Sequence, residues 1–264
     1  MKTTVADICW TMNEIAPIAL AESWDNPGLL VGKVDAPVKK IMLALDLTLE
    51  VAEQAIEAKV DMIITHHPLY FNLPKTLAVT DAKMECVYAL IKSDIAVYAA
   101  HTNLDAAVGG VNDVLAELLS LTQVVAIENP EHPEQGLGRI GVLSEPLTLE
   151  AFAQNVKKVL AADGIAFADA GKPVYKVAVV GGAGSDFIAA ALDAGADTFV
   201  TGDLKYHVAQ KALDQGINVI DAGHQFTEMP VVTKLEQVLS SWAEENKRTI
   251  EIILAEEEQI LRHL

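Results

Sequence analysis

The 264-residue chain has few of the features that mark secreted, membrane or nucleic-acid-binding proteins. Its two cysteines, Cys9 and Cys86, lack CxxC spacing and are too few for a disulfide framework or a structural zinc site. Basic residues number 19 against 37 acidic ones, so the net charge of −18 repels phosphate backbones and anionic lipids. A charge interrupts every apolar run before the roughly 18 residues of a membrane span, and the first residues do not resemble a secretory signal. We expect a cytoplasmic protein that binds no membrane and has little affinity for nucleic acid.

Apolar residues make up 51% of the chain, which is enough to bury a sizeable core. Short β-rich runs alternate with alanine-rich stretches of helical periodicity, a pattern typical of α/β proteins with mainly parallel strands. The predicted strands are Lys40–Ala44, Met62–Thr65, Ile95–Ala100, Lys176–Val180, Thr198–Thr201, Asn218–Ala222 and a closing Arg248–Ala255. The predicted helices are Val5–Ile15, Leu49–Ala58, Asp81–Lys92, Asn112–Leu119, Leu149–Ala161, Asp186–Ala194, Tyr206–Gln215 and Thr233–Asn246.

The two halves of the chain repeat one series of elements. Each half runs strand, helix, strand, helix, strand, and each series ends in a histidine followed four positions later by an acid: His101 and Asp105, then His224 and Glu228. Any two βαβ units look alike, but the fold does not demand these paired endings, so they favour a duplication. The loop from Glu128 to Gly141 is rich in Pro and Gly and predicts a boundary between residues 1–127 and 128–264, although the C-terminal segment could pack back on the first half.

The strongest local signal is the pair His66 and His67 at the end of a buried strand. Ligands of doubly wound sheets bind outside the carboxyl ends of the strands, so these side chains are expected to face a crevice. Pro68 favours a bend that lets both imidazoles reach one pocket. The alternative is that both are core histidines held by hydrogen bonds.

The other candidates occupy equivalent positions in the two halves. A four-residue spacing puts His224 and Glu228 on one face if the segment is helical, and imidazole with carboxylate is the ligand mixture of zinc, iron or manganese. Together with His66, His67 and Asp105 they could hold two ions and leave positions open, as in metal hydrolases. His101 is then a further ligand, or a group that orients Asp105 or transfers a proton.

Five segments, in this order, resemble the motifs of the Nif-three-like family, many of whose members are named GTP cyclohydrolase I type 2 homologues. They are Leu20–Gly32, Thr65–Phe71, His101–Asp105, Thr201–Asp203 and Gly223–Glu228. The resemblance implies two intertwined α/β/α halves, a dinuclear metal site in the cleft between them, and subunits assembled into a homohexameric ring. It also implies that His66 and Asp105 bind one ion, that His67 and His224 bind the other, and that Glu228 binds both.

The favoured function is metal-dependent hydrolysis of a nucleotide or another small phosphorylated or heterocyclic substrate, with GTP cyclohydrolase activity implied by the resemblance alone. The alternative is a metal-binding regulatory or scaffold protein whose ring assembly matters more than turnover. The ligand types accept zinc, iron, manganese, cobalt or nickel. Two roles stay open: His207 either lines the site or lies on a helix surface, and Gly181–Gly184 is either an anion-binding loop or a tight turn capped by Ser185.

Overall fold

The computed structural model describes residues 2–72, 74–127 and 135–263. The chain forms two compact units: unit 1 comprises Met1–Leu104 and Val232–Glu258, and unit 2 comprises Asp105–Val231 and Gln259–Leu264. This division differs from the expected one at residue 127, and residues 128–134 of the expected boundary loop lie outside the described part of the chain. Unit 1 takes in a late segment because β11 (Glu251–Leu254) pairs with β2 (Lys40–Ala44).

Unit 1 is built on a five-stranded sheet in the order β1-β4-β3-β2-β11. Strands β11, β2, β3 (Met62–Thr65) and β4 (Ala96–Ala99) are parallel, and β1 (Gly28–Val31) is antiparallel to β4. The helices of this unit are α1 (Val5–Ile15), α2 (Leu49–Glu57), α3 (Ala82–Lys92) and the later part of α9 (His224–Glu245), with a 3-10 turn at Ile18–Leu20.

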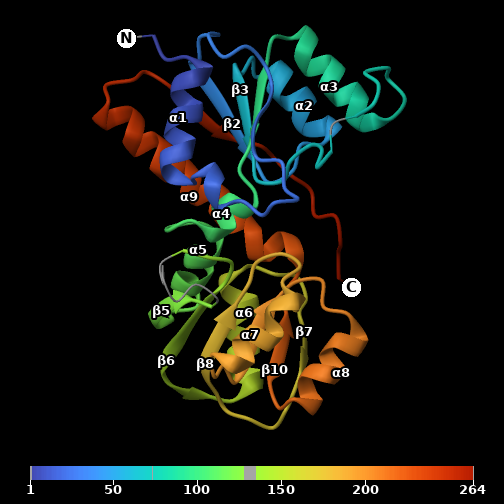
Figure 1. The fold of residues 1–264 in the computed structure, drawn as a ribbon, viewed down its shortest axis with the longest axis vertical. Coiled ribbons are helices and arrows are strands. Elements are labelled where there is room, and N and C mark those ends of the chain that lie inside the picture. The colour runs from blue at the N-terminus through green and yellow to red at the C-terminus, as the bar shows by residue number, and fades with distance from the viewer. Residues whose placement is uncertain (1, 73, 128–134, 264) are drawn as a thin grey trace. The chain divides into compact units, whose positions relative to one another are not determined.

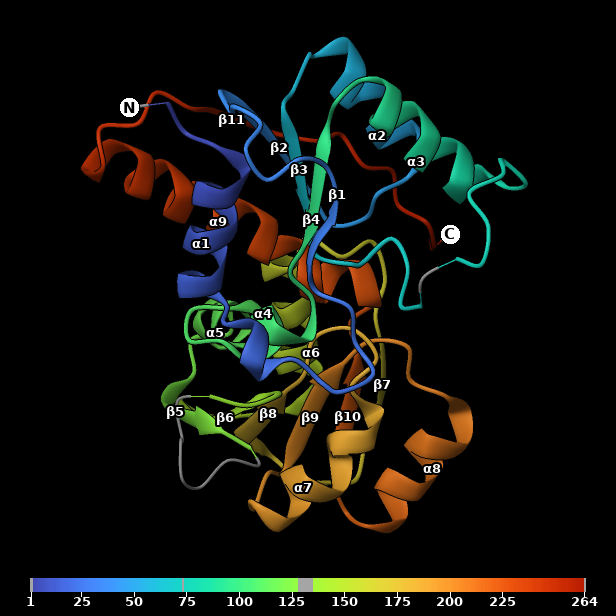
Figure 2. The ribbon, with the colours of Figure 1, turned by 45° about the horizontal axis from the view of Figure 1, so that its top comes forward.

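Helices cover both faces of this sheet (Figures 1 and 2). Met42, Ile63 and Val97 belong to one apolar cluster with the buried side chains of α2 and α3. Successive strand residues point to opposite faces, so their neighbours face α1 and α9, whose residues Ile8 and Leu235 are buried. Strands buried on both faces read as unbroken apolar runs, which explains why the sequence pattern predicts them well.

Unit 2 is built on a six-stranded sheet in the order β5-β6-β8-β9-β10-β7. Its strands are β5 (Thr122–Ala126), β6 (Arg139–Leu147), β7 (Ala166–Ala168), β8 (Val174–Val179), β9 (Thr198–Thr201) and β10 (Asn218–Asp221). Strands β8, β9 and β10 are parallel, and the other three pair antiparallel. The helices are the end of α4 (Thr102–Ala106), which begins in unit 1, then α5 (Val111–Leu118), α6 (Leu149–Val159), α7 (Ile188–Asp193), α8 (Tyr206–Asp214) and the start of α9, with a 3-10 turn at Ser185–Phe187.

The sequence itself sets the starts of several helices. Thr4 and Asp7 form a reciprocal capping box at the start of α1, in which each side chain accepts a backbone N–H at the helix start. Thr48, Asp81 and Thr148 cap α2, α3 and α6 in the simpler way, each by accepting one backbone N–H. Helix α9 begins at His224, nine residues before the predicted start at Thr233, because the helix continues through Pro230.

The two sheets share a core topology. In unit 1 the series β2-α2-β3-α3-β4 gives three adjacent parallel strands, with β1 antiparallel to the last of them. In unit 2 the series β8-α7-β9-α8-β10 does the same, with β7 antiparallel to the last. The predicted α/β class with two similar halves is confirmed. In the described part of the chain, no helix combines the length and the apolar character that crossing a bilayer requires.

Candidate metal centre

Three imidazoles gather at the carboxyl edge of the unit 1 sheet. His66 and His67 follow β3, and His101 comes just after β4, its neighbour in the sheet. Each offers a ring nitrogen within 4.8 Å of the others, a spacing that could hold a metal ion. The ring centroids lie 5.1 to 5.5 Å apart. Nitrogen donors of this kind suit zinc, iron and similar divalent metals, so the residues present fit such an ion.

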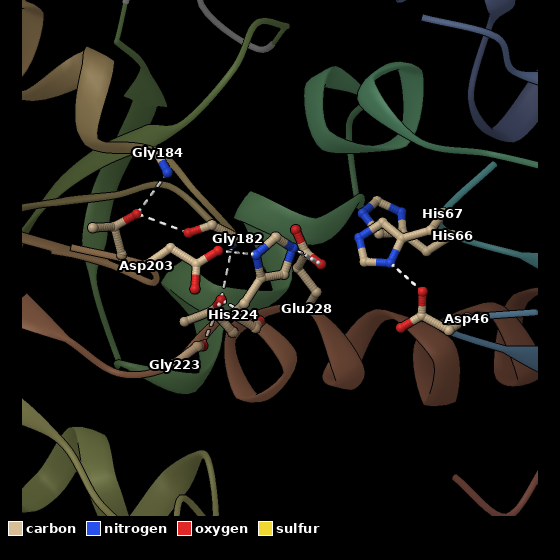
Figure 3. A network of polar contacts seen from close by, with 12 residues as sticks. Asp46, His66, His67, Gly182, Gly184, Asp203, Gly223, His224 and Glu228 are labelled. Atoms are coloured by element: carbon tan, nitrogen blue, oxygen red, sulfur yellow. Dashed lines mark hydrogen bonds and ion pairs between the residues drawn. The ribbon is translucent and has the colours of Figure 1, made fainter. Parts of the chain in front are cut away.

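Hydrogen bonds at Nδ1 hold the rings of His66 and His67. The His66 Nδ1 lies 2.8 Å from the carbonyl oxygen of Ala100, which can only accept, so Nδ1 carries a proton and the neutral ring has its lone pair at Nε2. The His67 Nδ1 lies 2.9 Å from Asp46 Oδ1 (Figure 3). Asp46 lies two residues after the end of β2, at the same edge of the sheet. A carboxylate or carbonyl at Nδ1 is the usual support of a metal-binding histidine.

Asp25 supports His101 in the same way. Its side chain is completely covered, and Oδ1 lies 2.9 Å from the His101 Nδ1. The other oxygen accepts from the backbone N–H and the hydroxyl of Thr102, and the N–H of Asn26 donates to Oδ1. Burial alone would raise the pKa of Asp25, but the bonds from His101, Thr102 and Asn26 outweigh it and lower the pKa to about 2. Asp25 is therefore an anchored anion that orients His101.

Unit 2 repeats this construction at the carboxyl edge of its own sheet. His224 is the first residue of α9, just after β10, and Glu228 lies four residues later on the same helix face. The His224 Nδ1 lies 2.8 Å from Oδ2 of Asp203, which follows β9, and its Nε2 lies 3.1 Å from Oε2 of Glu228 (Figure 3). His224 therefore lies between two carboxylates, an electrostatic setting that favours a cation.

The loop that follows β8 is held by hydrogen bonds from its backbone amides. The backbone N–H groups of Gly181, Gly182 and Gly184 donate to Asn112 Oδ1, Thr227 Oγ1 and Thr201 Oγ1, each at 2.9 Å. These amides are engaged within the protein, which favours the tight turn over an anion-binding loop. Ser185 does not cap this turn, because Gly184 occupies the N-cap position and no side-chain hydrogen bond caps the 3-10 turn at Ser185–Phe187.

Gly182 has to be glycine because the carboxylate of Glu228 lies over its bare backbone. Its φ is +61°, and an added Cβ would lie 2.1 Å from Glu228 Oε1 and 3.1 Å from His224 Nε2. We expect Gly182→Ala to displace Glu228 and to weaken metal binding at least tenfold in titrations of the apoprotein with zinc. Gly171→Ala is the matched control, because Gly171 also has a positive φ, +74°, but nothing lies within 4 Å of its added Cβ. Equal metal affinities in the two variants would contradict this role.

Asp105 lies on α4, and its backbone is fixed by a residue that sequence reasoning did not single out. Asn112 is 1% exposed, and its Nδ2 donates to the Asp105 carbonyl at 3.1 Å while its Oδ1 accepts from Gly181. Asp46 was missed as well. His207, in contrast, is an exposed residue of α8 whose ring contacts Tyr206. This position matches the alternative in which His207 lies on a helix surface.

The chain is similar to known proteins over nearly its whole length. The model of the family Duf34/NIF3 (NGG1p interacting factor 3) matches residues 3–259. A Clostridium perfringens protein named GTP cyclohydrolase 1 type 2 homolog is 37% identical over 233 residues, which cover 88% of this chain and 89% of that protein. A Bacillus cereus protein related to NIF3 has a TM-score of 0.92 and 28% identity, covering 100% of this chain and 99% of its own. A Staphylococcus aureus hypothetical protein also has a TM-score of 0.92, with 30% identity and all of both chains covered. The chain therefore belongs to the Duf34/NIF3 family.

Proposed function

We propose that the protein is a metal-dependent hydrolase with two divalent ions per subunit. The observation that carries the proposal is that His67, His101 and His224 each have Nδ1 within 2.9 Å of a carboxylate oxygen. Such aspartate–histidine pairs fix the tautomer that presents the Nε2 lone pair to a metal or to a proton, and they raise the basicity of Nε2. Three such pairs lie at strand ends, and Glu228 lies beside His224 in one of them. A stable core does not require so many polar pairs at the ends of its strands.

The proposed ligands are His66, His67, Asp105, His224 and Glu228. His66 and His67 belong to unit 1, and Asp105, His224 and Glu228 belong to unit 2. When bound, divalent ions of this kind lower the pKa of coordinated water and polarise substrate oxygens.

The other residues of the proposed site position groups or transfer a proton. Asp46, Asp25 and Asp203 hold the rings of His67, His101 and His224 by their Nδ1 atoms. His101 is 12% exposed at its side chain and is held by an anchored anion, so its Nε2 can accept and return a proton during hydrolysis.

The substrate class is proposed from the relatives. The Clostridium perfringens protein and others like it are named GTP cyclohydrolase 1 type 2 homologs, which points to a nucleotide or a related heterocyclic or phosphorylated compound. A homohexameric ring and a location in the cytoplasm belong to the same proposal. The second candidate, a metal-binding regulatory or scaffold protein, is favoured by the family description, which names an interacting factor.

Elemental analysis followed by activity screening tests the proposed function. We expect protein purified without chelator or tag histidines to carry close to two ions per chain, and the metal-replete protein to hydrolyse at least one nucleotide or phosphoester. A metal ratio near zero that added zinc, manganese or iron cannot raise would remove the basis of the proposal. Full metal content without turnover of any nucleotide or phosphoester would favour the scaffold.

Asp203→Asn tests whether the carboxylate that holds the His224 ring contributes to metal binding. The amide cannot carry the charge that stabilises the protonated Nδ1 of His224, so we expect metal affinity to fall about 10- to 100-fold. Isothermal titration of the apoprotein with zinc measures the change. Asp214→Asn, an exposed residue at the end of α8, removes the same charge from the surface and is expected to bind zinc like wild type.

A further inference from the structure

Two large aromatic side chains lie exposed beside the imidazoles of unit 1. Trp24 is 57% exposed and Phe71 is 49% exposed, although such rings usually contribute most to a protein core. Their centroids lie 5.6 Å apart, and the His101 ring lies 5.9 Å from Trp24 and 5.6 Å from Phe71. His101 thus contacts both aromatic rings and both neighbouring imidazoles.

The two segments that carry these rings are both anchored by hydrogen bonds. The side chain of Asp25, next to Trp24, is completely covered and accepts hydrogen bonds from His101 and Thr102. The Nδ2 of Asn26 donates to the carbonyl of Tyr70, next to Phe71, at 2.7 Å. Each exposed ring is therefore adjacent in sequence to a residue whose position is fixed, and one hydrogen bond ties the two segments together.

An exposed aromatic pair on fixed supports is suited to bind another flat ring. Aromatic side chains offer stacking surface at low entropic cost, and stacking accepts any base because every base has a π-face. The His101 ring contacts these two rings and also the imidazoles of His66 and His67. The substituents of a ring stacked on Trp24 or Phe71 can therefore reach the proposed metal ligands His66 and His67.

We propose that Trp24 and Phe71 form the substrate subsite for a planar heteroaromatic ring, such as a purine or a related fused heterocycle. This inference rests on the proposed function, because it places the ring of the substrate beside the metal-dependent chemistry. Recognition by stacking accepts different purines with similar affinity, and it depends on the two aromatic rings more than on the metal.

The test uses the full, metal-replete chain, with guanosine and adenosine as probes and ribose as the non-aromatic control. Calorimetry measures affinity, and fluorescence in a Trp10→Phe/Trp242→Phe background reports on Trp24 alone. We expect both purine nucleosides to bind and to quench Trp24, and ribose to do neither. Trp24→Ala and Phe71→Ala are each expected to weaken binding about 5- to 150-fold. Trp24→Phe keeps a ring and should lose less.

The matched control is Trp10→Ala, since Trp10 lies on α1, is 72% exposed and is expected to have no effect on nucleoside binding. Metal content is measured in every variant and is expected to stay at the wild-type ratio, which separates failure of the subsite from failure of the metal centre. Equal affinity in wild type and Trp24→Ala, or no binding of either nucleoside, would overturn the inference. A fall in molar mass by light scattering in Trp24→Ala, with nucleoside affinity unchanged, would assign the pair to contact with a second copy and would also overturn it.

Discussion

The double variant His67→Ala/Glu228→Ala is expected to lose nearly all bound metal while its far-ultraviolet circular dichroism stays close to that of wild type. The two changes remove one proposed ligand from each unit. Glu228 is the ligand that is proposed to bind both ions. Because neither side chain belongs to the apolar clusters of the sheets, the fold is expected to survive. Plasma mass spectrometry of protein purified without chelator measures the ratio, which should fall from close to two to close to zero.

The matched control for this variant is His207→Ala/Glu244→Ala. It removes the same two side-chain types from exposed positions on α8 and α9, so it is expected to keep the wild-type metal ratio. Full metal content in the His67→Ala/Glu228→Ala variant would refute the proposed ligand set. Loss of the dichroism spectrum would assign the two residues to folding instead, and titrating the single variants with zinc would then decide between the two roles.

Arg139→Ala is expected to cost about 3 to 5 kcal/mol of unfolding free energy, the largest stability effect we foresee. Arg139 is 1% exposed and donates to the Asp113 carboxylate and to the carbonyl oxygens of Gly136, Gly138 and Ala107. Removal of the guanidinium takes a donor from the carboxylate and from three carbonyls, of which the Asp113 carboxylate and the Ala107 carbonyl also accept from the backbone N–H groups of Gly109 and Gly110. Urea titration monitored by circular dichroism measures the loss.

Arg139→Lys should recover little of this stability, because one ammonium cannot reproduce the fork of donors that serves acceptors on several sides. Lys158→Ala, an exposed cation in the last turn of α6, is the control and should stay within about 0.5 kcal/mol of wild type. If the unfolding free energy of Arg139→Ala also stays within about 0.5 kcal/mol of wild type, the buried guanidinium does not stabilise the contact between Ala107–Asp113 and Gly136–Gly138.

Much of the fold could be predicted because its central strands are buried on both faces. The predicted bounds of β2, β3 and β9 are those of the structure, since an unbroken apolar run between polar residues leaves little choice. Strands β1, β5 and β7 were not predicted. They lie at sheet edges and are short or partly exposed, so they carry neither a long apolar run nor a clear alternation.

The candidate site divides in a similar way. The imidazoles were predicted because the ends of parallel strands collect functional side chains, and the structure brings His66, His67 and His101 together, as it does His224 and Glu228. Their supporting partners could not be read from spacing. Asp25 and His101 are 76 residues apart, and only the folded sheet brings them into contact. The division of the ligands between two ions stays a prediction.

The parallel pairing of β11 with β2 has a consequence for synthesis of the chain. Unit 2 is one continuous stretch, Asp105–Val231, apart from its last six residues, so the ribosome can release it for folding as a block. The sheet of unit 1 instead waits for Glu251–Leu254, which emerge after the whole of Asp105–Val231, and until then one edge of β2 has no neighbour. An unpaired edge strand invites pairing with other chains. A nascent chain stalled before residue 251 therefore carries an unfinished first half beside a second half that is already able to fold, and is expected to depend on chaperones.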